Sequence, residues 1–152
     1  MIRIRRFRTD DLDLLAELDR VCFEPGICYS PAELRFHTSH PASTTLVAEI
    51  PPSVAGFVVG RLERDSAGHV ITIDVDPRSR RRGVGKALMS ALHEELASHG
   101  VRMVYLEVDR GNSDALEFYL KLGYRRFGTL RGYYGAGRDA ERMVCKLEPC
   151  PG

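Results

Sequence analysis

The sequence predicts an α/β fold in which about seven strands form one mixed sheet covered by four helices. Three observations predict it. Short β-branched runs alternate with segments of helical periodicity, turn-forming residues separate these segments, and neither an internal repeat nor a long linker divides the chain. The length of 152 residues and the hydrophobic content of 43% suit a single domain over residues 1–152.

The N-terminal segment predicts a strand followed by two helices. Apolar residues alternate with arginines over residues 2–7, as in a half-exposed strand. Thr9–Asp11 is expected to supply N-capping side chains to a helix that ends at Glu24–Gly26. Apolar residues lie at helical spacing within it, namely Leu12, Leu15, Ala16 and Val21. Ser30–Glu33 forms a capping box with proline at the first helical position, which predicts a second helix start.

The middle of the chain predicts a strand meander and then a long helix. Residues 44–50 and 54–62 are expected to be strands joined by a hairpin turn at Pro51–Ser53. A second turn at Asp65–Gly68 leads to a β-branched strand at residues 70–75. The long helix runs from about Gly83 to His99, and Gly100 is expected to end it.

The C-terminal part predicts a central strand, a short helix and a hairpin. The strand at Met103–Val108 is apolar on both faces, as central strands are. Asn112 or Ser113 caps a short helix that ends near Leu122. Residues 127–134 and 142–147 are expected to form the final hairpin.

The segment from Val75 to Leu88 predicts an anion-binding site. It joins a strand to a helix through a loop that contains two glycines and a cluster of cations. Glycines allow a ligand to approach the backbone, and the first N–H groups of a helix attract negative charge. The spacing fits neither a nucleoside-triphosphate loop, since Ala87 replaces the hydroxyl residue, nor a dinucleotide fingerprint, since Leu88 replaces the third glycine.

The remaining pattern, R-x-x-G-x-G at Arg80, Gly83 and Gly85, resembles the pyrophosphate loop of the GNAT superfamily of acyl-CoA-dependent N-acetyltransferases. Taken alone, the pattern also fits a solvated basic turn. A downstream match supports the resemblance, with Leu106–Val108, Asn112, Ala115, Tyr119 and Gly123 in the superfamily's order. The tail from Arg131 to Met143 resembles one branch, the bacterial enzymes that acetylate the N-terminal alanine of a ribosomal protein, and their archaeal and eukaryotic N-terminal acetyltransferase relatives.

This resemblance implies the GNAT fold, acetyl-CoA as cofactor, and a protein or peptide N-terminus as acceptor, with a ribosomal protein as one candidate partner. It implies that Glu107 is the general base, with a pKa raised toward neutrality by a buried cleft, and that Tyr119 is the general acid. It places the acceptor against Tyr133 and Tyr134. The residues that it assigns to acetyl-CoA are Ile73, Asp74, Val75, Arg80, Arg81, Arg82, Gly83, Val84, Gly85, Lys86, Asn112 and Tyr119.

Each assignment has a structural alternative. Glu107 fits a solvent-facing strand position, Tyr119 fits the core face of a helix, and Asn112 fits a plain helix cap. Two departures from the branch concern the acceptor. The chain has no tryptophan, so Phe23–Ser30 replaces a Pro-Trp-Ser element, and Asp74 stands where alanine is commoner.

Composition restricts the other classes of function. A net charge of +1 gives no nucleic-acid-like field, so no direct nucleic-acid partner is expected. No apolar run is long enough for a membrane span or a signal core, which predicts a cytoplasmic protein without a membrane partner. The histidines are assigned no chemistry. The cysteines at 22, 28, 145 and 150 have spacings that suit no zinc site, so no metal is expected and the thiols are expected to be free.

Three other functions stay open at this stage. A small-molecule amine or lysine acetyltransferase would use the same chemistry. A non-catalytic acyl-CoA-binding module would bind the cofactor without turnover. An RNA- or ribosome-binding protein would use the cations at residues 78–82 and would bind RNA with a steep salt dependence.

Overall fold

The computed structural model describes residues 1–148, which form a seven-stranded mixed sheet and four α-helices. The strands are β1 (Arg3–Arg6), β2 (Ser43–Ile50), β3 (Ser53–Leu62), β4 (Ala67–Val75), β5 (Met103–Asp109), β6 (Arg125–Leu130) and β7 (Ala140–Lys146). The helices are α1 (Leu12–Cys22), α2 (Pro31–Ser39), α3 (Val84–Ser98) and α4 (Ser113–Lys121), with 3-10 turns at Thr9–Asp11 and Pro77–Ser79. The predicted fold class is confirmed.

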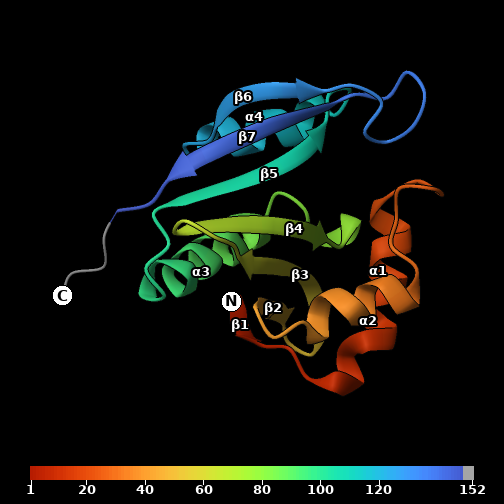
Figure 1. Cartoon of the computed structure of the whole chain (residues 1–152). Coiled ribbons are helices and arrows are strands. Elements are labelled where there is room, and N and C mark those ends of the chain that lie inside the picture. Colours follow the sequence, from red (N-terminus) through yellow and green to blue (C-terminus); the bar gives the residue numbers. More distant parts are fainter. Residues whose placement is uncertain (149–152) are drawn as a thin grey trace.

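The sheet has the order β1-β2-β3-β4-β5-β7-β6. Neighbouring strands are antiparallel except for β4 and β5, which are parallel and are connected through α3. A parallel pair requires such a crossover, because its second strand must start at the same end of the sheet as the first. Figure 1 shows α1 and α2 on one face of the sheet and α3 behind the other.

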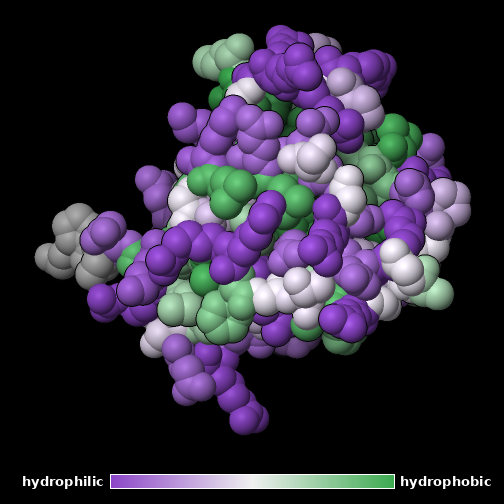
Figure 2. Space-filling view, turned by 90° about the horizontal axis from the view of Figure 1, so that it is seen from above, coloured by the Kyte–Doolittle hydropathy of each residue, from purple (hydrophilic) through white to green (hydrophobic). Residues whose placement is uncertain are grey.

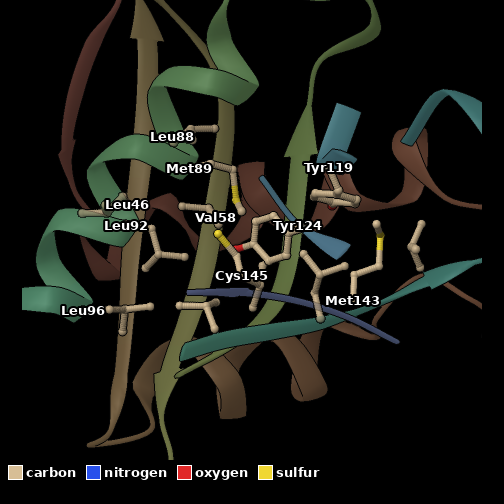
Figure 3. Packing of buried hydrophobic residues seen from close by; sticks show 14 of the residues in the cluster. Leu46, Val58, Leu88, Met89, Leu92, Leu96, Tyr119, Tyr124, Met143 and Cys145 are labelled. Atoms are coloured by element: carbon tan, nitrogen blue, oxygen red, sulfur yellow. The ribbon is translucent and has the colours of Figure 1, made fainter. Parts of the chain in front are cut away.

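The core has two parts, one on each face of the sheet. The larger part packs α3 and α4 against the sheet around Tyr124, which is 1% exposed. Figure 3 shows Tyr124 between the apolar side chains of α3 and the β7 residues Met143 and Cys145. Its hydroxyl lies 2.6 Å from His93 Nε2, so His93 belongs to this packing. The position on the polar face of α3 that the sequence predicts for His93 is wrong. The smaller part packs α1 and α2 on the opposite face, with Leu15, Leu34 and Phe57 at its centre.

Two of the predicted caps are confirmed. The Ser30 hydroxyl accepts a hydrogen bond from the Glu33 N–H at 3.1 Å, and the Glu33 carboxylate accepts one from the Ser30 N–H at 2.9 Å. The Asn112 side chain accepts from the Ala115 N–H at 3.1 Å, so Asn112 and not Ser113 caps α4. Thr9–Asp11 supplies no side-chain cap to α1. Instead, Asp11 forms a two-bond ion pair with Arg5 at 2.8 and 2.9 Å.

Several predicted boundaries and faces differ from the structure. β4 begins at Ala67, inside the predicted turn, and β6 ends at Leu130, so Tyr133 and Tyr134 lie in a loop. β5 is central but is not apolar on both faces, because Tyr105 and Glu107 alternate with its buried residues. Val21 is 58% exposed, because α1 buries only the face that meets the sheet.

Residues 1–148 contain no helix that combines the length and the apolar character needed to cross a bilayer. In the same residues, no three His, Cys, Asp or Glu side chains are grouped as metal ligands. Cys22, Cys28 and Cys145 are free thiols, and Cys150 lies outside the described residues. Figure 2 shows a face that is mostly hydrophilic, with small hydrophobic groups between polar side chains.

Candidate active site

A cleft opens where β4 and β5 separate. The two strands pair only over Ala67–His69 and Met103–Tyr105. Beyond this segment β4 stays paired with β3 and β5 stays paired with β7, so their inner edges diverge (Figure 1). The cleft has a volume of about 1810 Å³. Backbone groups on these two edges have no strand partner and are available to a ligand.

One end of the cleft has the local geometry that suits an anion. Gly83 adopts a φ of +85°, which favours glycine, and places α3 directly after the cationic loop. No side chain caps α3, so the first N–H groups of the helix are free. A side chain at Gly85 would come within 3.0 Å of the Phe118 ring, so glycine at this position allows the start of α3 to lie against Phe118.

Most of the predicted cofactor residues line this cleft, namely Ile73, Val75, Arg80, Arg81, Gly83, Val84, Gly85, Lys86, Asn112 and Tyr119. Asp74 and Arg82 do not line it. Arg82 is exposed, and the Asp74 side chain is buried on the other side of β4. Asn112 both lines the cleft and caps α4, so the two alternatives for this residue are compatible.

Glu107 lies on the inner part of β5 between two basic side chains. One carboxylate oxygen lies 2.6 Å from His69 Nε2, and the other accepts a hydrogen bond from Arg142 Nε at 3.0 Å. Burial raises the pKa of Glu107, but His69 and Arg142 together outweigh it, and the pKa lies below its ordinary value. The expected rise toward neutrality is therefore wrong, because the cleft that buries Glu107 also supplies two partners that stabilise its ionised form.

His69 is a site residue that sequence reasoning missed. Its ring stacks on Tyr105 with centroids 4.3 Å apart, and its Nδ1 lies 3.7 Å from Glu63. A line of polar side chains therefore runs from Glu107 through His69 to Glu63, which is 35% exposed. No sequence motif indicates His69 as a site residue, because only the parallel register of β4 and β5 brings His69 close to Glu107.

Tyr119 reaches the cleft from α4 and is otherwise enclosed. It is 8% exposed, and its ring packs edge-on against Phe118 and Tyr124. Burial, with a smaller effect of the Asp74 charge, raises the pKa of Tyr119 well above its ordinary value. The hydroxyl is therefore protonated at neutral pH, as a proton donor must be.

The other end of the cleft is formed by two loops from distant parts of the chain. The Tyr134 hydroxyl donates to the Glu107 carbonyl at 3.4 Å, and Tyr133 packs edge-on against Tyr134 at 4.9 Å. Arg138 binds Glu24 at 2.8 Å and Asp109 at 2.6 Å. The Arg138–Glu24 ion pair thus joins the segment before β7 to the segment before α2, and Tyr134 brings the segment before β7 to Glu107.

Asp74 is neither exposed nor part of the cleft wall. A bulge in β4 leaves Ile71 without a partner on β3. Side chains after the bulge therefore point to the opposite face of the sheet from the one that strict alternation would give them. Ile73 and Val75 then pack on the α3 side, and Asp74 faces Asp19 of α1. Both aspartates are fully buried, at 1% and 0% exposure.

Comparison with known proteins gives a consistent result. Residues 12–124 match the model of the acetyltransferase (GNAT) family. The chain is 31% identical to an N-alpha-acetyltransferase of Sulfurisphaera tokodaii, over 95% of this chain and 93% of the relative.

Two solved structures share the fold. One is the ribosomal-protein-S18-alanine N-acetyltransferase from Escherichia coli, with a TM-score of 0.88 and 24% identity over 100% of this chain and 97% of that one. The other is Arabidopsis thaliana NAA60 in complex with acetyl-CoA, with a TM-score of 0.84 and 23% identity over 97% of this chain and 99% of that one.

Proposed function

Because the chain belongs to the GNAT acetyltransferase family, its reaction is acetyl transfer from acetyl-CoA, and we propose that the acceptor is the N-terminal α-amine of a protein or peptide. The observation that carries this proposal is the position of Glu107. It lies beside the loop end of the cleft, where Tyr133 and Tyr134 can contact a chain terminus.

Acetyl-CoA supplies an activated acetyl group as a thioester. Its phosphates would be held by the cationic loop and the free N–H groups of α3, and the pantetheine arm by the unpaired inner edge of β4. These residues suit the group, because the anion site and the free backbone edge lie along one continuous cleft.

Two side chains of the protein hold or move protons in this proposal. Glu107, ionised at neutral pH, takes a proton from the acceptor ammonium, directly or through a water, and leaves a neutral amine as nucleophile. His69 lies 2.6 Å from the carboxylate and holds it in position. The Tyr119 hydroxyl carries the proton that a departing thiolate needs.

The lowered pKa of Glu107 favours an α-amine over a lysine side chain. An α-amine has a pKa of ~7.7–8.0 and a lysine ~10.4, so neutralising lysine costs roughly 3.5 kcal/mol more at the same pH. A carboxylate with a low proton affinity is a weak base. It is therefore matched better to the amine that loses its proton more easily.

Within this class, we propose a peptide that begins with alanine as the first acceptor to test, and a ribosomal protein as its source. The Escherichia coli structure named above is a ribosomal-protein-alanine enzyme, and the tail of this chain resembles that branch. We place the reaction in the cytoplasm, where newly made protein N-termini and acetyl-CoA meet.

A thiol-release assay with acetyl-CoA tests the proposal. The panel contains peptides with free Ala or Ser N-termini, the same peptides with blocked N-termini and an internal lysine, and polyamines, and product mass locates the acetyl group. We expect turnover of free N-termini only, a loss of about 100-fold in kcat/KM in Glu107→Gln, and a similar loss in Tyr119→Phe. The matched control is Tyr124→Phe, which removes a buried hydroxyl outside the cleft.

Other outcomes contradict specific parts of the proposal. Turnover of lysine or polyamines alone would overturn the acceptor and leave the family chemistry intact. Binding of acetyl-CoA with no turnover of any amine would indicate a binding module.

A further inference from the structure

Two buried aspartates beneath the loop end of the cleft have no part in the proposed proton transfers. The Tyr29 N–H donates to Asp19 Oδ2 at 2.6 Å, and the Thr72 hydroxyl donates to Asp74 Oδ1 at 2.8 Å. The other two oxygens, Asp19 Oδ1 and Asp74 Oδ2, are buried and have no hydrogen-bond partner among residues 1–148. Two orphaned carboxyl oxygens in one place require an explanation, because burying an unpaired charge is costly.

A single proton held between the two carboxyl groups satisfies both oxygens. Asp74 faces Asp19 where α1 packs on β4, and burial together with Asp19 raises the pKa of Asp74 well above its ordinary value. Two neighbouring carboxylates cannot both be ionised in a buried site, whereas a carboxylic acid donates a strong hydrogen bond to a carboxylate.

The other groups around the pair do not replace this proton. Arg80 is a cation that acts on Asp74, but it is exposed, and its effect on the pKa of Asp74 is smaller than those of burial and Asp19. Cys22, Tyr29 and Tyr119 also lie in range of Asp74, and burial raises the pKa of each, to about 11 for Cys22 and about 12 for Tyr29. These three groups are neutral at physiological pH and supply no balancing charge.

The pair is connected to the segment at residues 23–30, which we name the acceptor loop because it forms one side of the loop end of the cleft. Besides its N–H bond to Asp19, Tyr29 donates its hydroxyl to the Ile71 carbonyl at 3.4 Å. At the other end of the loop, the Cys22 thiol donates to the Val75 carbonyl at 3.3 Å. Both ends of the acceptor loop are therefore attached to β4 around the aspartate pair.

We propose that Asp19 and Asp74 share one proton, and that this proton-bridged pair positions the acceptor loop against β4. The part that concerns acceptor binding rests on the function proposed above. Loss of the proton places two negative charges in contact, which loosens α1 and the acceptor loop from the sheet. Acceptor binding then weakens, while the anion site for acetyl-CoA, formed by α3 and its loop, is unchanged.

The first test measures the proton itself and needs no acceptor. Infrared difference spectra at pH 7 report the carbonyl stretch of a protonated carboxyl group. We expect the wild-type band to be lost in Asp74→Asn and in Asp19→Asn. The matched control is Asp11→Asn, because Asp11 is also buried but is ionised beside Arg5, so its removal leaves the band intact. A wild-type protein without the band overturns the shared proton.

The second test separates acceptor binding from acetyl-CoA binding. In Asp74→Asn, the amide donates to Asp19 and accepts from Thr72, so it imitates the protonated pair at every pH. We expect the acceptor KM of the wild type to rise with increasing pH relative to that of Asp74→Asn. We expect Asp74→Ala to raise this KM about tenfold, with kcat and acetyl-CoA affinity little changed.

Hydrogen exchange at the Tyr29 N–H covers the case in which Asp74→Ala does not fold or no acceptor is turned over. The chemical rate of amide exchange itself rises with pH. In the wild type we expect the exchange of the Tyr29 amide to rise more steeply with pH than this chemical rate. In Asp74→Asn we expect it to follow the chemical rate. The positioning role is overturned if the Tyr29 amide exchanges alike in the wild type and in Asp74→Asn. It is also overturned if the ratio of their acceptor KM values does not change with pH. If no acceptor is found while the infrared band and the difference in amide exchange are both present, only the proposed function is refuted.

Discussion

At the scale of the residue, the neighbours of Glu107 determine its chemistry. A glutamate on a half-buried strand has its pKa raised by burial alone. His69 and Arg142 reverse that effect, and both come from other strands of the sheet. The proton affinity of Glu107 is therefore a property of three strands that meet and not of its own segment.

Replacing His69 by Gln is expected to move the acidic limb of the kcat/KM profile to higher pH. The His69 interaction lowers the pKa of Glu107, so removing His69 raises the pH at which this carboxylate ionises. In the proposed function Glu107 acts as a base only when it is ionised. The measurement is kcat/KM from pH 4 to 9. His93→Gln is the matched control, because His93 contacts Tyr124 and not Glu107. If the acidic limb of the profile is unchanged in His69→Gln, His69 does not affect the ionisation of Glu107.

At the scale of the element, α2 shows a helix start that local sequence specifies completely. Ser30 and Glu33 bond each other's backbone N–H groups, and Pro31 occupies the first turn. The same residues end the acceptor loop one position after Tyr29. The cap therefore fixes both the first turn of α2 and the chain direction at the cleft.

Ser30→Ala is expected to lower the free energy of unfolding by about 1 kcal/mol, because the Glu33 N–H loses its acceptor. Urea unfolding measures this difference. Ser98→Ala is the control, since Ser98 lies in the last turn of α3 and donates only to the Glu95 carbonyl. Equal losses in the two variants would contradict a specific capping contribution.

At the scale of the whole molecule, the cleft lies between two parts of one sheet. β1 to β4 form one part and β5 to β7 form the other, and three register pairs join them. A ligand bound along the cleft would contact both parts. Acetyl-CoA is thus expected to complete, through its own polar groups, a sheet that the chain leaves open.

Hydrogen exchange with and without saturating acetyl-CoA tests this expectation. We expect slower exchange of those amides of Val70–Val75 and Leu106–Asp109 that lie on the inner edges, because they have no strand partner in the free protein. Amides of β1 and β2, which pair with each other far from the cleft, serve as the internal control. Protection spread evenly over the sheet would indicate global stabilisation without contact at these edges.

The sequence by itself determined the elements and the fold class, and it predicts the anion site. Seven strands and four helices follow from periodicity, and the Ser30 and Asn112 caps follow from residue type, because these signals act between residues a few positions apart. The cationic loop with Gly83 and Gly85 is also a local feature, since a strand, a loop and a helix start suffice to build it.

Only the tertiary structure decided which side chains share an environment. The bulge at Ile71 turns Asp74 toward Asp19. The sequence of β4 alone does not predict which face Asp74 occupies, because that face depends on how β4 pairs with β3. In the same way, the parallel register places His69 beside Glu107 across 38 positions of the chain. Burial and charge act through space, so the pKa of a site residue is fixed only when the strands have met.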